Sequence, residues 1–133
     1  MCYFMYAATD NELNSDIFHE YNRKYNIYIE DITAYVPERM KDYVYYSINR
    51  QCACDFYSSD ARRNNEKELL ALLTLIKQSG SLIFCIVDDG NNKYEGISLQ
   101  KVMESFPDEE LTLDDFLNRY PIALKPNHVY KVS

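Results

Sequence analysis

The opening of the chain has the hydrophobic pattern of a strand followed by a short helix. Residues 2–8 are apolar or aromatic without interruption, which is typical of a strand near the centre of a sheet. Thr9-Asp10-Asn11-Glu12 then has the form of a capping box, in which side-chain oxygens bind the first free backbone N–H groups of a helix. The predicted helix carries Leu13, Ile17 and Tyr21 at the spacing of one buried face.

Two further stretches before the middle of the chain predict strands. In residues 25–29, apolar side chains alternate with polar or half-polar neighbours, as in a half-buried strand. Residues 43–48 are dense in aromatic and β-branched side chains, which favour strands. Between the two stretches, Pro37 has the fixed φ that opens a single helical turn through Met40.

The clearest helical pattern lies between Asn65 and Gly80. Asn65 is the predicted N-cap and Glu68 completes a capping box, while Lys77 and Gly80 are typical C-terminal signals. Leu69, Leu72, Leu73 and Ile76 follow the spacing of one buried face, and Leu70 and Leu75 widen this stripe. A stripe this broad predicts a helix that packs on a sheet.

A continuous apolar run follows this helix. Residues 81–87 predict a strand that is buried on both faces, within which Cys85 is expected to be a small, inert core residue. Asp88-Asp89-Gly90-Asn91-Asn92 is a cluster of turn-forming residues. The cluster predicts a β-hairpin whose second strand is formed by residues 93–97.

The last third of the chain predicts two helices and one strand. Ser98 is the expected N-cap of a helix that runs through Ser105. Thr112-Leu113-Asp114-Asp115 is another capping box, and Pro121 ends the helix that follows it. Residues 129–132 alternate and include a lysine, as in an edge strand.

The order of these elements is β, α, β, β, α, β-hairpin, α, α, β, which lacks the strict alternation of a parallel doubly wound fold. We therefore predict one α+β domain over residues 1–133. Its sheet is expected to be antiparallel or mixed, with about five to six strands and with helices packed mainly on one face.

The composition excludes several classes of function. Hydrophobic residues make up 47% of the 133 positions and charged residues 26%, close to globular averages, so disorder is not indicated. No apolar run approaches the ~18 residues of a membrane span, and the N-terminus lacks the features of a signal peptide, so we expect a cytoplasmic protein. The net charge of −7 argues against nucleic-acid binding, which requires clustered Lys and Arg.

Three cysteines are the strongest candidates for chemistry. Cys52 and Cys54 are one residue apart, and an antiparallel pairing of residues 2–8 with residues 43–48 would bring Cys2 to the same edge of the sheet. Thiolates bind soft metals such as zinc and carry redox chemistry. Unligated thiols, a metal site and a redox or disulfide pair therefore remain open as alternatives.

A zinc site would need a fourth ligand. Structural zinc is bound by four side chains, usually with Cys-x2-Cys spacing, and the Cys-x-Cys spacing of this chain is one residue shorter. Asp55, His19 and His128 are the candidates for the missing position, although nothing in the sequence places any of them beside the thiols. We therefore expect no cofactor, with zinc or another soft metal as the alternative.

Signatures of catalysis are missing from the sequence. It contains no glycine-rich phosphate loop, no Gly-x-Ser-x-Gly elbow and no His-Glu-x-x-His motif, and its 3 glycines leave little material for a nucleotide cradle. Removal of Met1 would make Cys2 an N-terminal nucleophile, but no oxyanion donors accompany it. The sequence therefore favours a protein that is not an enzyme.

Several short segments form a set around these cysteines. They are Met1-Cys2-Tyr3, Ala7-Ala8-Thr9-Asp10, Val44-Tyr45-Tyr46-Ser47, Cys52-Ala53-Cys54-Asp55-Phe56 and residues 82–89. The set resembles a family of small uncharacterised bacterial proteins that begin with Met-Cys and carry a central Cys-Gly-Cys before an aromatic residue. Ala53 replaces the family's glycine. The resemblance implies that Cys2, Cys52 and Cys54 form one group, and it implies no activity.

Two functions from different classes follow. The first is an interaction protein, immunity-type or regulatory, whose acidic surface meets a basic protein partner. The expected partner-binding carboxylates are Asp108, Glu109, Glu110, Asp114 and Asp115. A plainer interpretation is that these charges only keep the domain soluble. The second function is a thiol-based metal or redox protein centred on Cys2, Cys52 and Cys54.

Overall fold

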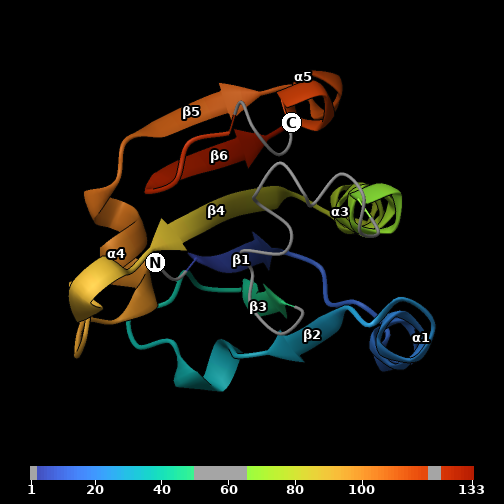
Figure 1. The fold of residues 1–133 in the computed structure, drawn as a ribbon, viewed down its shortest axis with the longest axis horizontal. Coiled ribbons are helices and arrows are strands. Elements are labelled where there is room, and N and C mark those ends of the chain that lie inside the picture. Colours follow the sequence, from blue (N-terminus) through green and yellow to red (C-terminus); the bar gives the residue numbers. More distant parts are fainter. Residues whose placement is uncertain (1–2, 50–65, 120–123) are drawn as a thin grey trace.

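The computed structural model describes residues 3–49, 66–119 and 124–133. Its centre is a six-stranded sheet in the order β2-β3-β1-β4-β6-β5 (Figure 1). Neighbouring strands are antiparallel except for β5 and β6, which are parallel, so the sheet is mixed. The strands are β1 Tyr3–Thr9, β2 Tyr28–Asp31, β3 Val44–Asn49, β4 Leu82–Asp88, β5 Asp108–Leu111 and β6 His128–Val132.

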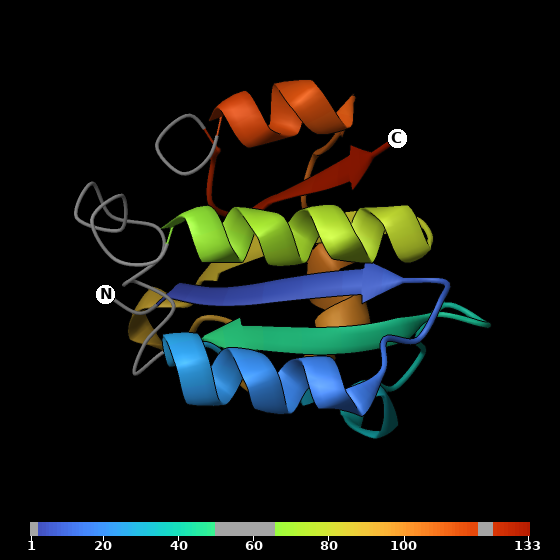
Figure 2. The ribbon, with the colours of Figure 1, turned by 90° about the vertical axis from the view of Figure 1, so that its right-hand side faces the viewer.

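Helices cover both faces of this sheet, but unequally. Three helices, α1 (Ser15–Tyr25), α3 (Glu66–Ser79) and α5 (Leu113–Arg119), lie side by side across one face (Figure 2). The opposite face carries α4 (Leu99–Ser105) and the short 3₁₀ helix η1 (Thr33–Tyr35) (Figure 1). The predicted α+β fold with a mixed sheet is confirmed. We call the face that carries α4 and η1 the α4 side.

Alternation along the strands sends side chains into two hydrophobic cores. Strand β4 is buried on both faces, as its continuous apolar run predicts. Leu82, Phe84 and Ile86 pack beneath the three helices, whereas Ile83, Cys85 and Val87 pack beneath α4. The larger core includes Leu69, Leu72, Leu73 and Ile76, which confirms the predicted buried face of α3.

The first turn of the chain differs from its prediction. Thr9 belongs to β1, so the expected capping box at residues 9–12 is wrong. The N-cap of α1 is Asn14, whose side chain accepts a hydrogen bond from the Asp16 N–H at 2.9 Å. Asp10 instead accepts a hydrogen bond from the Ser81 N–H at 2.8 Å, across 71 residues of sequence. A long-range contact has displaced the local one.

Helix α1 also runs farther than its pattern predicts. It ends at Tyr25, and Asn26 closes it in the left-handed conformation with φ 56°, a role that asparagine fills in place of glycine. The following strand is β2, Tyr28–Asp31, rather than residues 25–29. The single turn predicted from Pro37 is also displaced, because the 3₁₀ turn of this region is η1, which precedes Pro37.

The hairpin predicted after β4 is wrong. The turn residues lead into the short 3₁₀ helix η3 (Gly90–Asn92), and residues 93–97 form turns instead of a strand. The acidic segment Asp108–Leu111 forms β5 at the edge of the sheet, and its pattern did not predict a strand. Strand β6 therefore lies between β4 and β5, and it is not the edge strand that was expected.

Candidate functional site

A groove runs along α4, where the helix crosses β4 and β6. Its volume is about 360 Å³, at the lower end of the range for small-ligand pockets. We call it the α4 groove. It is lined by Met40, Ile83, Gln100, Met103, Glu104, Phe106, Asp108, Val129 and Lys131. Its walls are mostly apolar, and its charged groups are two carboxylates and one ammonium group.

The local sequence fixes α4 over this groove. The Ser98 hydroxyl accepts a hydrogen bond from the Lys101 N–H and caps the helix, as predicted. Val102 and Met103 are buried against the sheet, in the core of the α4 side. Phe106 follows the helix, and its ring meets that of Tyr94 edge to face, with the centroids 5.6 Å apart. Packing rather than helix length holds this two-turn element in place.

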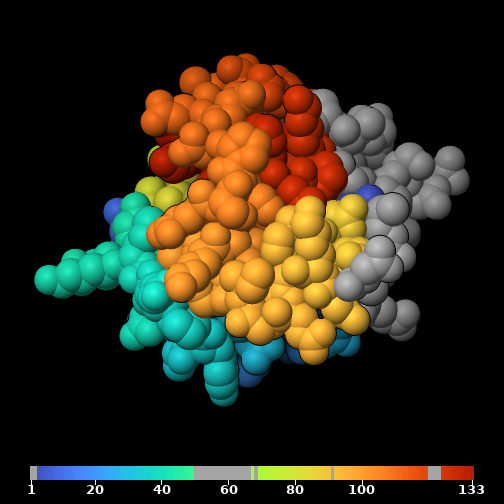
Figure 3. All heavy atoms as spheres, turned by 90° about the vertical axis from the view of Figure 1, so that its left-hand side faces the viewer, coloured from blue at the N-terminus to red at the C-terminus, as the bar shows by residue number. Residues whose placement is uncertain are grey.

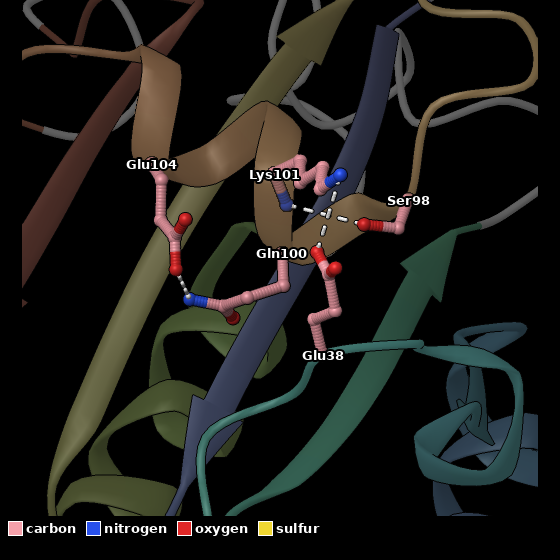
Figure 4. A network of polar contacts seen from close by, with 5 residues as sticks. All are labelled: Glu38, Ser98, Gln100, Lys101 and Glu104. Atoms are coloured by element: carbon pink, nitrogen blue, oxygen red, sulfur yellow. Dashed lines mark hydrogen bonds and ion pairs between the residues drawn. The ribbon is translucent and has the colours of Figure 1, made fainter.

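A chain of hydrogen bonds connects three lining residues of the groove through the buried Tyr45. The Met40 N–H donates to the Tyr45 hydroxyl at 2.9 Å, and that hydroxyl donates to Gln100 Oε1 at 2.5 Å. Gln100 Nε2 then donates to Glu104 Oε1 at 3.1 Å (Figure 4). Tyr45 is 1% exposed and Gln100 is 6% exposed, so these bonds compensate buried polar groups. The chain fixes the position of the exposed Glu104 carboxylate.

The loop that supplies Met40 carries two unusual backbone conformations. Glu38 and Asp42 have φ values of 61° and 66°, a left-handed region that aspartate tolerates and glutamate seldom occupies. The Glu38 conformation costs about 1 kcal/mol or more, which the surrounding structure must offset. Lys101 of α4 lies 3.6 Å from the Glu38 carboxylate and links the loop to the helix (Figure 4).

The outer rim of the groove carries an ion pair. Lys131 Nζ lies 3.0 Å from Asp108 Oδ2. The hydrogen bond between them lowers the pKa of Asp108 and raises the pKa of Lys131. Both side chains are about half exposed, so the pair contributes little to stability and exchanges readily with solvent.

A smaller hollow of about 150 Å³ lies on the same side, between the start of β1 and the N-terminus of α4. Phe4, Tyr6, Tyr94 and Ile97 are among its lining residues. Burial is the main cause that raises the pKa of Tyr6 to about 12, with smaller effects from Cys85 and Asp89. The Tyr6 hydroxyl therefore stays protonated and remains a hydrogen-bond donor throughout the physiological range.

The α4 side also carries the large hydrophobic side chains that the described residues expose. Phe4 and Tyr28 project from β1 and β2 on this face, Tyr35 lies in η1, and Ile97 precedes α4. They are between 41% and 78% exposed. Figure 3 views the molecule from this side, with α4 in orange and the η1 segment in cyan. The opposite face has its apolar surface covered by α1, α3 and α5 (Figure 2).

The thiol hypothesis falls largely outside the described residues. Cys2, Cys52, Cys54 and Asp55 lie outside them. The strand pairing on which the hypothesis depends is present, because β1 and β3 are antiparallel with Met5 opposite Ile48. The start of β1 and the end of β3 therefore lie at the same end of this strand pair. Cys85 is completely buried, and burial raises its pKa to about 12, so it is the inert core residue that was predicted.

The two histidines do not meet. His19 is exposed on α1, beside Asp16, Glu20 and Arg23, whereas His128 begins β6 on the other side of β1 and β4. The His128 ring lies 5.5 Å from that of Tyr130. Within the described residues, no group of three or more His, Cys, Asp or Glu side chains is arranged to hold a metal ion.

The structure divides the five predicted partner-binding carboxylates between the two faces of the sheet, and two of them are paired. By the strand register, Asp108 and Glu110 lie on the α4 side, whereas Glu109 faces the opposite side, which also carries α5 with Asp114 and Asp115 (Figure 2). Asp108 contacts Lys131, and Glu109 forms an ion pair with Arg119. The other three form no ion pair with the described residues, and they are Glu110, Asp114 and Asp115. Asp114 and Asp115 also stabilise the N-terminus of α5, where the Thr112 hydroxyl accepts the Asp115 N–H.

The sequence pattern did not predict the groove. Its central polar residue, Gln100, lies one turn from Met103 on the buried face of α4. A glutamine at a buried helical position was the signal that would have found it, because such a residue needs a polar partner. That partner, Tyr45, is 55 residues away and is visible only in the fold.

Comparison of the chain with protein-family models, curated proteins and solved structures finds no match. Among the described residues, no helix combines the length and the apolar character needed to cross a membrane. The α4 side, with its groove and its exposed apolar side chains, is the candidate functional surface.

Proposed function

We propose that this protein is a small cytoplasmic interaction protein, immunity-type or regulatory, that binds a basic protein partner through its α4 side. One observation carries the proposal. The described residues expose their large hydrophobic side chains on the side that also bears the α4 groove. Phe4 and Ile97 adjoin in the smaller hollow of the same side, and exposed apolar groups that adjoin one another mark interaction surfaces.

The charge of the molecule determines the kind of partner. The chain carries a net charge of −7, and carboxylates outnumber ammonium groups around the groove. Glu110 at the adjacent sheet edge adds a further unpaired carboxylate. A negative surface speeds the encounter with a basic protein and repels acidic ones, so the partner we propose is positively charged on its contact surface.

The experiment compares capture of partners by matched variants. Tagged wild-type protein and two tagged variants are incubated separately with extract of the source cells. The double variant Tyr35→Ser/Ile97→Ser removes exposed apolar groups, and Glu104→Lys reverses one charge of the groove. Glu12→Lys is the control, because Glu12 is exposed in the turn between β1 and α1. We expect a basic protein that wild type and Glu12→Lys retain and that both α4-side variants lose by tenfold or more. Equal retention by all four proteins contradicts the proposal.

A thiol-based metal or redox function is the second candidate. It is favoured by the antiparallel pairing of β1 with β3, which brings together the strand ends that adjoin Cys2 and Cys52 in the sequence. Metal analysis of anaerobically purified protein tests it. A stoichiometric ion that is absent from Cys52→Ser and Cys54→Ser supports a metal site, most simply zinc. Metal-free protein whose thiols react slowly eliminates this candidate.

A further inference from the structure

The α4 groove has the chemistry of an anchor pocket for one side chain of the partner. Resting on the function proposed above, we propose that it binds a single arginine of a partner segment. The guanidinium group would be neutralised by Glu104 and Asp108, and the aliphatic stem would lie on the apolar floor. The inference adds a defined pocket and a residue type to the proposed surface.

The floor of the groove suits the stem of a long basic side chain. Ile83 and Val129 project from adjacent strands, and Met103 and Phe106 form the wall on the α4 side. Arginine and lysine bury their methylene groups on such surfaces while the charged end stays at the rim. Phe106 adds an aromatic ring, to which a cation is attracted.

The rim has the charge that such an end group requires. The charged residues that line the groove are the carboxylates Glu104 and Asp108 and one cation, Lys131. The lining therefore has an excess of negative charge. Glu104 is held by the Gln100 amide at 3.1 Å, and only one of its two oxygens takes part in that bond. Asp108 forms an exposed ion pair with Lys131, and replacing Lys131 by another cation costs little free energy. Lys131 is thus the cation that a ligand would displace.

A second amide N–H of Gln100 suits a peptide better than a bare cation. Gln100 has two amide N–H groups, of which one donates to Glu104. The other has no hydrogen-bond acceptor among the described residues, and because Gln100 lines the groove, a ligand can reach this donor in place of water. A peptide carbonyl beside the arginine would accept from it. Such a ligand satisfies both the carboxylates and the amide.

Arginine fits this site better than lysine. The guanidinium group is planar, carries five N–H donors and is more weakly hydrated than an ammonium group, so it enters an apolar groove at lower cost. Hydrogen bonds from arginine to carboxylates are also among the strongest in proteins. The expected preference is therefore arginine over lysine, and both over a neutral analogue of the same shape.

The test is a titration followed by NMR that requires no partner. Isotope-labelled wild-type protein is titrated with N-acetyl-arginine amide and, separately, with N-acetyl-citrulline amide, which has nearly the same shape but no charge. We expect saturable shifts of the Gln100 side-chain amide with arginine, with a dissociation constant on the order of 1 mM. Citrulline should bind at least about tenfold more weakly, because the charged contact is absent.

Variants make the assignment specific. Glu104→Gln should weaken arginine binding by about tenfold, and Lys131→Met should strengthen it, because the competing cation is removed. Glu12→Gln, the matched charge change outside the groove, should leave it unchanged. Equal shifts with arginine and citrulline, or unchanged binding in Glu104→Gln, would overturn the assignment. Because the titration contains no partner protein, its failure removes the anchor pocket alone, whereas the capture experiment decides the interaction function.

Discussion

Replacement of Tyr45 by phenylalanine tests the hydrogen-bonded chain that underlies the α4 groove. The change removes one hydroxyl and leaves the ring in place. It deprives the Met40 N–H of its acceptor and Gln100 Oε1 of its donor. An unsatisfied buried polar group costs about 1–3 kcal/mol. Gln100 is buried and Met40 is half-buried, so water compensates the loss at the Met40 N–H in part. We expect the free energy of unfolding to fall by about 2 kcal/mol.

The neighbouring tyrosine is a matched control. Tyr46 points to the opposite face, where its hydroxyl accepts a single hydrogen bond from the Leu13 N–H at 3.1 Å. Tyr46→Phe therefore leaves one unsatisfied group instead of two, and should cost about 1 kcal/mol. Urea unfolding measures both losses, provided that the variants and wild type unfold with equal m values. For a domain of this size, a loss of about 2 kcal/mol lowers the midpoint of thermal unfolding by roughly 6–10 °C.

A double-mutant cycle with Gln100→Met separates the hydrogen bond from other effects of the tyrosine change. Each single variant leaves a buried polar group without its partner, whereas the double variant replaces both partners by apolar groups. The double variant should be more stable than the sum of the two losses predicts, by about 1 kcal/mol or more. The reasoning fails if Tyr45→Phe unfolds within about 0.5 kcal/mol of wild type, or if the two losses are additive.

Three further predictions concern other parts of the molecule. Gly80→Ala should lower the free energy of unfolding by about 1–3 kcal/mol in urea titrations. The new Cβ would lie 2.2 Å from Asp10 Oδ1 and would displace the carboxylate from its hydrogen bond with the Ser81 N–H. A variant as stable as wild type would contradict this. Burial raises the pKa of Tyr6 to about 12 from 10.0 in the unfolded chain, so the contribution of Tyr6 to stability is present below pH 10 and is lost toward pH 12. Tyr6→Phe should therefore lessen the decrease in the free energy of unfolding measured between pH 9 and 11.5. An unchanged dependence of this free energy on pH would refute the assignment to Tyr6. Cys85 should resist iodoacetamide in the native protein and react in urea, as measured by peptide mass spectrometry, and native alkylation at the denatured rate counts against its burial.

The acidic segment of β5 shows why the sequence pattern did not predict some of the strands. Asp108, Glu109 and Glu110 have low strand propensity, and the segment is only four residues long. It forms a strand because β6 offers it a parallel partner, and because Lys131 and Arg119 neutralise two of its carboxylates. Strand β6 and Lys131 follow α5 in the sequence, so the pattern of residues 108–111 could not reveal the pairing. The strand expected at residues 93–97 did not form for the opposite reason, since none of the described strands pairs with this segment.

The sequence by itself determined the elements with strong periodicity. The apolar stripe of α3, the double burial of β4 and the Ser98 cap of α4 follow from side-chain spacing and local hydrogen bonds, which act within a few residues. It also set the net negative charge and identified Cys85 as a core residue. Local physics is sufficient for these features because each one is complete within its own segment.

Only the tertiary structure decided which side of the sheet remains exposed and where a ligand would enter. The α4 groove joins side chains from four separate segments, and the bond between Tyr45 and Gln100 spans 55 residues. The contact of Asp10 with Ser81 likewise overrode a local capping signal. Such contacts depend on the order of strands in the sheet, and that order is set by the packing of whole faces rather than by the pattern within any one strand.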